Sequence, residues 1–198
     1  MFALVEDGSI TKMLSGNRGI TLNGKQYPKA IYTLWTKAER EAIGIYEVVW
    51  DNTNKKDERY YINTDVSYAF AGGVVTASYG SATAKAHADT LWTAQDEIDG
   101  KGTEGEVAVE GLKTVRIRIV KQQAAGELQN TDWYVVRKAD AGTSVPSAIT
   151  NHRAAVRTKC AEQETAITNA SNTAAIETLY TRDADGVSPL GDLPRLEV

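Results

Sequence analysis

The sequence is poor in the residues that form disulfides and most metal sites. Among 198 residues there is one cysteine, Cys160, and there are two histidines, His87 and His152. A single cysteine cannot form an internal disulfide, and a zinc site needs three or four ligands at matched spacing. We therefore expect no disulfide framework and no metal site, and we interpret Cys160 as a small apolar residue buried on a helix.

Long apolar runs and an excess of basic charge are also missing. No run approaches the ~20 apolar residues needed to cross a bilayer. Met1–Val5 leads straight into Glu6-Asp7-Gly8 and does not read as a secretory signal. The formal net charge is -4, whereas general nucleic-acid binders are usually basic. We expect neither membrane insertion nor a nucleic-acid partner.

Sequence patterns of catalytic sites are absent as well. The chain has no nucleophile elbow, no phosphate-binding Gly-rich loop before a helix and no dinucleotide fingerprint. His152 and Cys160 stand two turns apart on one expected helix, a spacing that does not make a nucleophile–base pair. The carboxylates of residues 96–99 could offer oxygen ligands to calcium, but their spacing does not match the calcium loop and favours a solvated turn. We expect no catalytic residue, no cofactor and no metal, and a protein that is not an enzyme.

The N-terminal half contains short runs of β-forming residues separated by turn signals. Hydrophobic residues make up 42% of the chain, which is enough for a core, and the length suits one large domain or two small ones. Asp7-Gly8 predicts a hairpin. Thr36 and Glu39 have the spacing of a capping box, which predicts one short helix. We expect a β-rich domain over residues 1–97, in which residues 81–97 fit either a helix start or an anchored loop.

The C-terminal half favours helices. Residues 98–111 are rich in Gly and charge and are expected to be a linker. Apolar residues at helical spacing then favour a helix over Leu112–Gln129, although Val115–Ile119 also alternates like a strand. We place a helical domain at residues 112–181 and an extended tail at residues 182–198, which a partner surface would hold if it is ordered. The predicted fold class is α+β: a small β-rich domain with one short helix, a linker and a helical bundle.

A helix, a turn and a longer helix are expected after residue 130. Thr131 is suited to cap the first helix, and Gly142 is suited to end it. Pro146 can open the second helix, because its missing N–H is not needed in a first turn. Trp133 is a large apolar anchor that we expect to pack between the helices.

The second of these helices is expected to span Ser147–Ala170. Its charged residues, including Arg153 and Arg157, are expected to stay in water. Its apolar face is expected to comprise Ile149, Val156, Cys160 and Ile167.

This region resembles a helical segment near the C-termini of phage tail-fibre, baseplate and fibre-assembly proteins. The shared pattern is an Asp-Trp pair, an apolar run ending in Arg, a Gly-bearing turn, an Ile/Val-Pro pair and two later arginines. The resemblance covers roughly residues 128–160, with His152 where a Tyr is common. The matching positions implied to shape and dock the helical module are Asp132, Trp133, Arg137, Pro146 and Arg153.

The resemblance implies a virion structural protein of a phage tail. It would organise or attach a tail fibre or baseplate component, with other tail proteins and copies of itself as partners, in the virion and in the host cytoplasm during assembly. One alternative is a module that binds host surface glycan through aromatic residues such as Trp92, because Tyr and Trp suit sugar contacts. The strand aromatics fit core packing better. A further alternative is a tail-fibre assembly chaperone that is absent from the virion.

Overall fold

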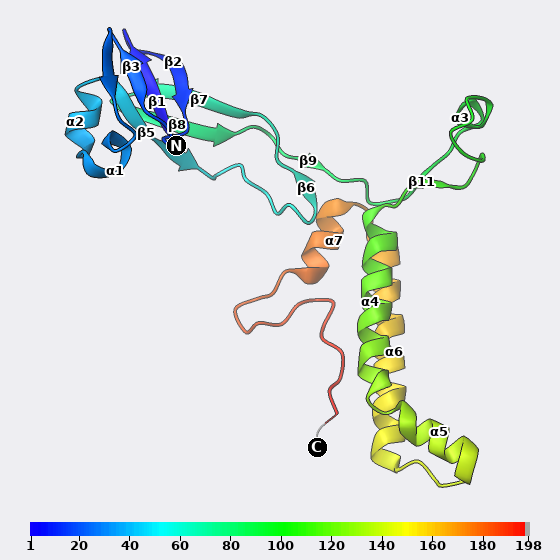
Figure 1. Cartoon of the computed structure of the whole chain (residues 1–198). Coiled ribbons are helices and arrows are strands. Elements are labelled where there is room, and N and C mark those ends of the chain that lie inside the picture. Colours follow the sequence, from blue (N-terminus) through cyan, green and yellow to red (C-terminus); the bar gives the residue numbers. More distant parts are fainter. Residues whose placement is uncertain (197–198) are drawn as a thin grey trace. The chain divides into compact units, whose positions relative to one another are not determined.

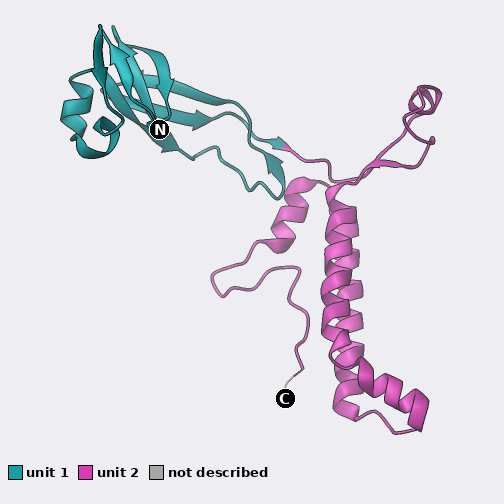
Figure 2. Ribbon diagram, in the orientation of Figure 1, with its two compact units in different colours: residues 1–83 teal, residues 84–198 magenta. Residues whose placement is uncertain are grey.

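The chain forms an α+β structure, as its sequence predicts. A computed structural model describes residues 1–196, with 37% helix and 23% strand (Figure 1). The chain divides into two compact units, Met1–Thr83 and Ala84–Val198 (Figure 2). The division therefore lies between Thr83 and Ala84 and not at the expected boundary between residues 97 and 98. No helix within the described part of the chain is both long and apolar enough to cross a membrane.

Unit 1 is built on a curled five-stranded sheet. Its strand order is β2-β1-β5-β8-β7, and every neighbouring pair is antiparallel except β5 and β8. The two edge strands, β2 and β7, also contact each other, so the sheet curls toward closure. These strands are β1 (Phe2–Glu6), β2 (Ser9–Leu14), β5 (Ile45–Asp51), β7 (Val66–Ala71) and β8 (Val74–Tyr79).

The first hairpin follows the sequence prediction at Asp7-Gly8. Both residues have positive φ, 48° and 74°, as a two-residue turn matched to the strand twist requires. Asn23-Gly24 repeats this conformation, with φ of 48° and 77°. That second turn joins β3 (Ile20–Leu22) to β4 (Lys25–Tyr27), which form a separate two-stranded pair. The turn chemistry therefore fixes two reversals of the chain locally.

Both faces of the unit 1 sheet carry apolar side chains, because alternate residues of one strand point to opposite sides. On β1, Ala3 and Val5 join one core cluster with Val48, Val75 and Ala77. The second cluster lies on the opposite face and consists of Leu4, Leu14, Ile31, Tyr32 and Ile45.

Two short helices belong to unit 1, where the sequence predicted one. They are α1 (Ile31–Leu34) and α2 (Lys37–Glu41). The capping box that opens α2 is confirmed: Glu39 N–H donates to the Thr36 hydroxyl, and Thr36 N–H donates to the Glu39 carboxylate at 2.7 Å. Helix α1 was not expected. It places Ile31 and Tyr32 in the second core cluster.

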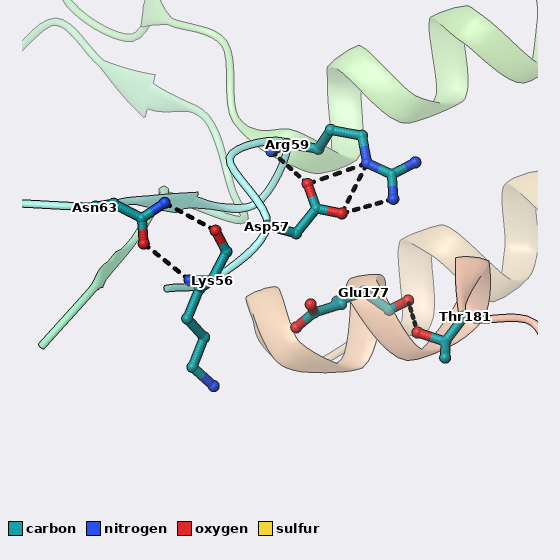
Figure 3. Close-up of polar contacts among 6 residues, drawn as sticks. All are labelled: Lys56, Asp57, Arg59, Asn63, Glu177 and Thr181. Carbon is teal, nitrogen blue, oxygen red and sulfur yellow. Dashed lines mark hydrogen bonds and ion pairs between the residues drawn. The ribbon is translucent and has the colours of Figure 1, made fainter. Parts of the chain in front are cut away.

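The loop after β5 is braced by its own Arg59 and by Asn63, which follows β6 (Tyr61–Ile62). The Asn63 amide bonds both to the backbone N–H of Lys56 (2.9 Å) and to its carbonyl (2.8 Å). The Arg59 guanidinium donates to both oxygens of Asp57 (Figure 3). The loop leads into β6 (Tyr61–Ile62), which pairs with β9 (Thr83–Ala84).

Unit 2 is built on two long helices that lie side by side (Figure 1). These are α4 (Leu112–Gln129) and α6 (Ser147–Asn169), joined through α5 (Asp132–Ala141). The prediction of a helix over Leu112–Gln129 is confirmed, and the strand alternative is excluded. The core of this unit comprises Val120, Ala124, Val156, Cys160, Ile167 and Leu190. Cys160 is therefore a buried core residue, as expected.

The last helix is α7 (Thr173–Tyr180), and the chain after it is ordered by unit 2 itself. Asn172 caps α7 through its side chain, and the Thr181 hydroxyl donates to the Glu177 carbonyl (Figure 3). Leu190 is buried in the core, and Gln163 Nε2 donates to the Gly191 carbonyl at 2.7 Å. The expectation that a partner must hold the tail was wrong up to residue 196; Glu197 and Val198 lie outside the described residues.

Residues 98–111 are not a simple linker. They belong to an excursion of the chain that contains β10 (Thr90–Leu91), α3 (Ala94–Ile98) and β11 (Val107–Val109), and β10 pairs with β11. Figure 1 shows this excursion leaving the N-terminal end of α4. We call residues 88–110 the arm. Its Gly-rich composition serves tight turns, including Gly100 and Gly105 with positive φ.

Candidate docking site

The elbow between α4 and α5 is held by a buried arginine of α6. The Arg153 side chain is 10% exposed, and its Nη1 atom donates to the Leu128 carbonyl (2.8 Å) and to the Thr131 hydroxyl (2.7 Å). The same nitrogen lies 2.8 Å from an Asp132 carboxylate oxygen. One side chain therefore joins the last turn of α4, the elbow and the first turn of α5 to α6. We call this set the Arg153 lock.

The structure corrects the expectation that Arg153 stays in water. The residue lies four positions after Ile149 and three before Val156, so helical spacing places it on the core-facing side of α6. Its burial is possible because carbonyl, hydroxyl and carboxylate oxygens meet the charge. Arg157, by contrast, is exposed as predicted.

Thr131 occupies the N-cap position of α5 but does not cap it. Its hydroxyl makes no hydrogen bond to the first turn of α5; it donates to the Leu128 carbonyl at 2.9 Å and accepts from Arg153. The backbone of Thr131, with φ of -117° and ψ of 2°, is not the extended conformation of a capping residue. Thr131 thus closes α4 instead of opening α5. Gly142 ends α5 in the left-handed conformation, as expected.

Helix α5 is ordered without a buried side chain. None of its ten residues is buried, and Trp133, Val135 and Val136 are 51%, 44% and 65% exposed. The expectation that Trp133 packs between the helices was therefore wrong. The sequence shows that Trp133 is a large apolar residue, but it does not show whether another element of the chain comes to cover it.

The aromatic residues of α5 form a stack with Arg137. The Arg137 guanidinium carbon lies 4.6 Å from the Trp133 ring centroid and 5.4 Å from that of Tyr134. The two ring centroids are 3.9 Å apart. Cation–π attraction to two rings holds the exposed side chains in one arrangement. A rigid aromatic surface of this kind loses little conformational entropy when it binds.

Pro146 lies at the start of α6, the helix that packs against α4. It stands at the N-cap with φ of -53° and ψ of 143°, one position before the first helical residue, Ser147. Its carbonyl accepts from Thr150 N–H at 3.0 Å. Pro146 sets the direction of α6, whereas the partners of Arg153 are Leu128, Thr131 and Asp132. The motif therefore divides into an ion pair between the buried Arg153 and Asp132, and a stack of Arg137 on the exposed Trp133.

Cys160 and the acidic turn at residues 96–99 both have partners within the chain. Burial raises the pKa of the Cys160 thiol, helped by a hydrogen bond to Glu164, so the thiol stays protonated near neutral pH. The Lys101 ammonium lies 3.0 Å from Asp96 and 3.1 Å from Asp99 and offsets part of the negative charge of this turn. Among residues 1–196, no three His, Cys, Asp or Glu side chains converge as a metal site would require.

Unit 1 contains a pocket that the sequence did not indicate. It has a volume of about 560 Å³ and is lined by β2, the loop after it, β3 and α1. Lys12 and Arg18 give its lining positive charge, and Tyr32 contributes an aromatic ring. Lys12 pairs with Leu4 across the hairpin and therefore shares the face on which Leu4 and Tyr32 pack. A bulge between Leu4 and Val5 shifts the register of the hairpin. The position of Lys12 beside the pocket depends on this register and could not be predicted from the sequence.

Comparison with protein-family models, with curated proteins and with solved structures finds no match to this chain. The function is therefore inferred from the geometry of the chain's own surfaces and from the sequence resemblance described above.

Proposed function

We propose that this protein is a structural component of a phage tail, and that it organises or attaches a tail-fibre or baseplate component by protein–protein docking. The observation that carries this proposal is the combination found at α5. The helix exposes Trp133, Val135 and Val136, yet the Arg153 lock fixes its start. Exposed aromatic and aliphatic side chains on a fixed helix are typical of helix-in-groove recognition.

In this proposal the partner supplies an apolar groove for α5. Truncating Trp133 or changing Val136 to Ser should leave the fold intact, because both side chains are exposed, and should remove the protein from assembled particles. Val187→Ser is the matched control, since Val187 is 58% exposed on the segment after α7 and lies outside α5.

The test is mass spectrometry of purified particles of the source phage, after infection in the presence of each variant. The wild-type chain and Val187→Ser should be found in particles at a fixed ratio to the capsid protein. Trp133→Ala and Val136→Ser should be depleted there while remaining folded in the lysate. Absence of the wild-type chain from particles, with abundance in infected cells, would favour the assembly chaperone.

A second candidate function is binding of a host surface glycan, and the unit 1 pocket favours it. Its volume of about 560 Å³ lies within the usual range for small-ligand sites. Lys12, Arg18 and Tyr32 together suit a sugar that carries an acidic group, because cations meet the acid and an aromatic ring meets the sugar face. We expect the wild-type chain to bind acidic polysaccharide and the double variant Lys12→Ala with Arg18→Ala to lose this binding. That result would support glycan binding.

A further inference from the structure

We propose that the arm is a self-association element, which docks in a groove along α4 in a second copy of the chain. None of residues 88–110 is buried. Four of its apolar side chains are instead largely exposed to solvent, and they are Leu91, Ile98, Val107 and Val109. An ordered segment that buries nothing of its own is poorly explained as part of a core and well explained as a contact surface.

The arm is held in shape by local interactions. Trp92 N–H donates to the Glu106 carbonyl at 2.9 Å, and Gly105 N–H donates back to the Trp92 carbonyl at 3.0 Å. The indole of Trp92 lies so close to Gly102 that a Cβ there would come within 2.3 Å of its nitrogen. Thr93 and Asp96 form a capping box at the start of α3. Because the arm is already ordered, docking costs little conformational entropy.

The base of the arm is clamped to α4. One Asp89 carboxylate oxygen accepts from Gly111 N–H at 2.6 Å, and the other accepts from the Thr114 hydroxyl at 2.8 Å. Gly111 is required here, since a Cβ would lie 2.3 Å from the Ala88 backbone. Figure 1 shows the arm pointing away from the α4–α6 pair. The exposed apolar side chains of the arm are therefore not used to cover its own helix.

A groove along α4 carries the matching surface. The groove is shallow and has a volume of about 470 Å³, with apolar contributions from Ile117 and Ala125. Arg118 and Lys121 stand in the same groove with side chains 51% and 59% exposed, and Lys121 also lies 3.0 Å from Glu164 of α6. The apolar residues of α4 are spread around the helix, and those facing α6 account for only part of them. A helix of this kind is typically covered on more than one side.

The opposite charges of the arm and of α4 indicate that the groove binds the arm of a second copy. Residues 89–110 contain seven carboxylates and one lysine, a formal charge of -6, whereas α4 contains four cations and one carboxylate, a charge of +3. Glu110 at the base of the arm already bonds to Arg118 at 2.6 Å, so this groove accepts arm carboxylates. Two copies can each place an arm on the other's α4, which closes the assembly as a symmetric dimer. The inference does not rest on the assignment to a phage tail.

Sedimentation velocity of the full chain over a concentration series tests the proposal. The wild type should associate, and added salt should weaken the association because opposite charges contribute to it. Ile98→Ser should raise the dissociation constant by at least about tenfold through lost apolar burial. Leu34→Ser is the matched control, because Leu34 and Ile98 are both 78% exposed. Circular dichroism verifies that each variant is folded.

A charge-reversal pair makes the test specific for the two surfaces. The arm variant carries Glu104→Lys with Glu106→Lys, and the groove variant carries Arg118→Glu with Lys121→Glu. Each variant alone should sediment as a monomer, and an equimolar mixture should recover association between unlike copies. A monomeric wild type, equal association of the Ile98→Ser and Leu34→Ser variants, or no recovery in the mixture would overturn the proposal.

Discussion

Arg153 occupies a position on α6 where its neighbours on the same face are apolar. Its charge is retained there because three oxygens from two different helices and the elbow meet one guanidinium nitrogen. An apolar residue of similar volume could fill the space, but it would leave the Thr131 hydroxyl and the Leu128 carbonyl with fewer partners. The arginine therefore fixes the angle between helices as well as stabilising them.

Removal of this side chain should destabilise the helical unit. Arg153→Ala should lower the free energy of unfolding by about 2–3 kcal/mol, because it leaves buried oxygens without their donor. Arg157→Ala is the control and should change stability by less than about 0.5 kcal/mol, as expected for an exposed residue. Urea denaturation followed by far-UV circular dichroism measures both. Equal stability of the two variants would contradict the role assigned to Arg153.

Two glycines with open surroundings should respond to alanine in opposite directions. No atom lies within 4 Å of a Cβ built at Gly126 or at Gly142, but Gly142 has a φ of +68° whereas Gly126 lies inside α4. Gly126→Ala should stabilise the helix by about 0.5–1 kcal/mol through lower backbone entropy in the unfolded chain. Gly142→Ala should destabilise the end of α5 by about 1 kcal/mol. Thermal unfolding of both variants tests the sign of each change.

At the scale of elements, α5 and the arm share a property that separates them from the other parts of unit 2. Both are ordered by hydrogen bonds, caps and ring contacts, and neither buries a residue of its own. The long helices α4 and α6 are ordered by a common apolar core. The arm and α5 gain stability from polar contacts, so their order should depend on the ionisation of the groups that make these contacts.

The arm should lose its order in acid before the helical core does. Hydrogen bonds from the Thr93 hydroxyl, Lys101 and the Thr93 N–H lower the pKa of Asp96 from 3.8 to about 2, and the Gly111 N–H and Thr114 hydroxyl lower that of Asp89. The unfolded arm therefore binds protons more readily than the folded arm. The stabilisation is complete above pH 3.8 and is lost as the pH falls toward about 2.

Amide hydrogen exchange at Thr93 and Gly111, measured from pH 3.8 down to about 2, tests whether the arm loses its order in acid. Protection of both amides should fall as the pH decreases, after correction for the intrinsic exchange rate. Asp96→Asn should flatten the response at Thr93, whereas Asp140→Asn, on α5, should leave it unchanged. Protection at Thr93 that is independent of pH in the wild type would argue against the assigned role of Asp96.

At the scale of the whole molecule, each unit has its own core. Unit 1 contains apolar clusters on both faces of its sheet, and unit 2 contains the cluster between α4, α6 and the segment after α7. The boundary at residues 83 and 84 leaves the arm and its Asp89 clamp complete in unit 2. A boundary at residues 97 and 98 would cut the arm between its two strands.

This difference predicts the behaviour of fragments. Residues 84–198 should fold cooperatively and be more stable than residues 98–198, which lack β10, Asp89 and the Lys85 carbonyl that accepts from Thr173 at 2.6 Å. Residues 1–83 should give a separate cooperative transition with a β-type spectrum. Thermal unfolding of the three fragments tests where the boundary between the two units lies. A 98–198 fragment as stable as 84–198 would place the boundary where the sequence alone suggested it.

The sequence by itself determined the features whose energies depend on neighbours along the chain. The turn at Asp7-Gly8, the capping box of Thr36 and Glu39 and the end of α5 at Gly142 follow from local backbone conformation and local hydrogen bonds. The helix over Leu112–Gln129 was favoured by the helical spacing of its apolar residues, although Val115–Ile119 also alternates like a strand. These predictions were confirmed because no distant element was needed to decide them.

The sequence also marked the residues of the candidate site but not their roles. Asp132, Trp133, Arg137, Pro146 and Arg153 belong to one recognisable pattern. Tertiary structure alone decided that Arg153 is buried and Trp133 exposed, and that the segment ending at Leu196 returns to α6. Burial depends on which surfaces meet, and the partners of Arg153 lie up to 25 residues away in sequence. No local pattern contains that information.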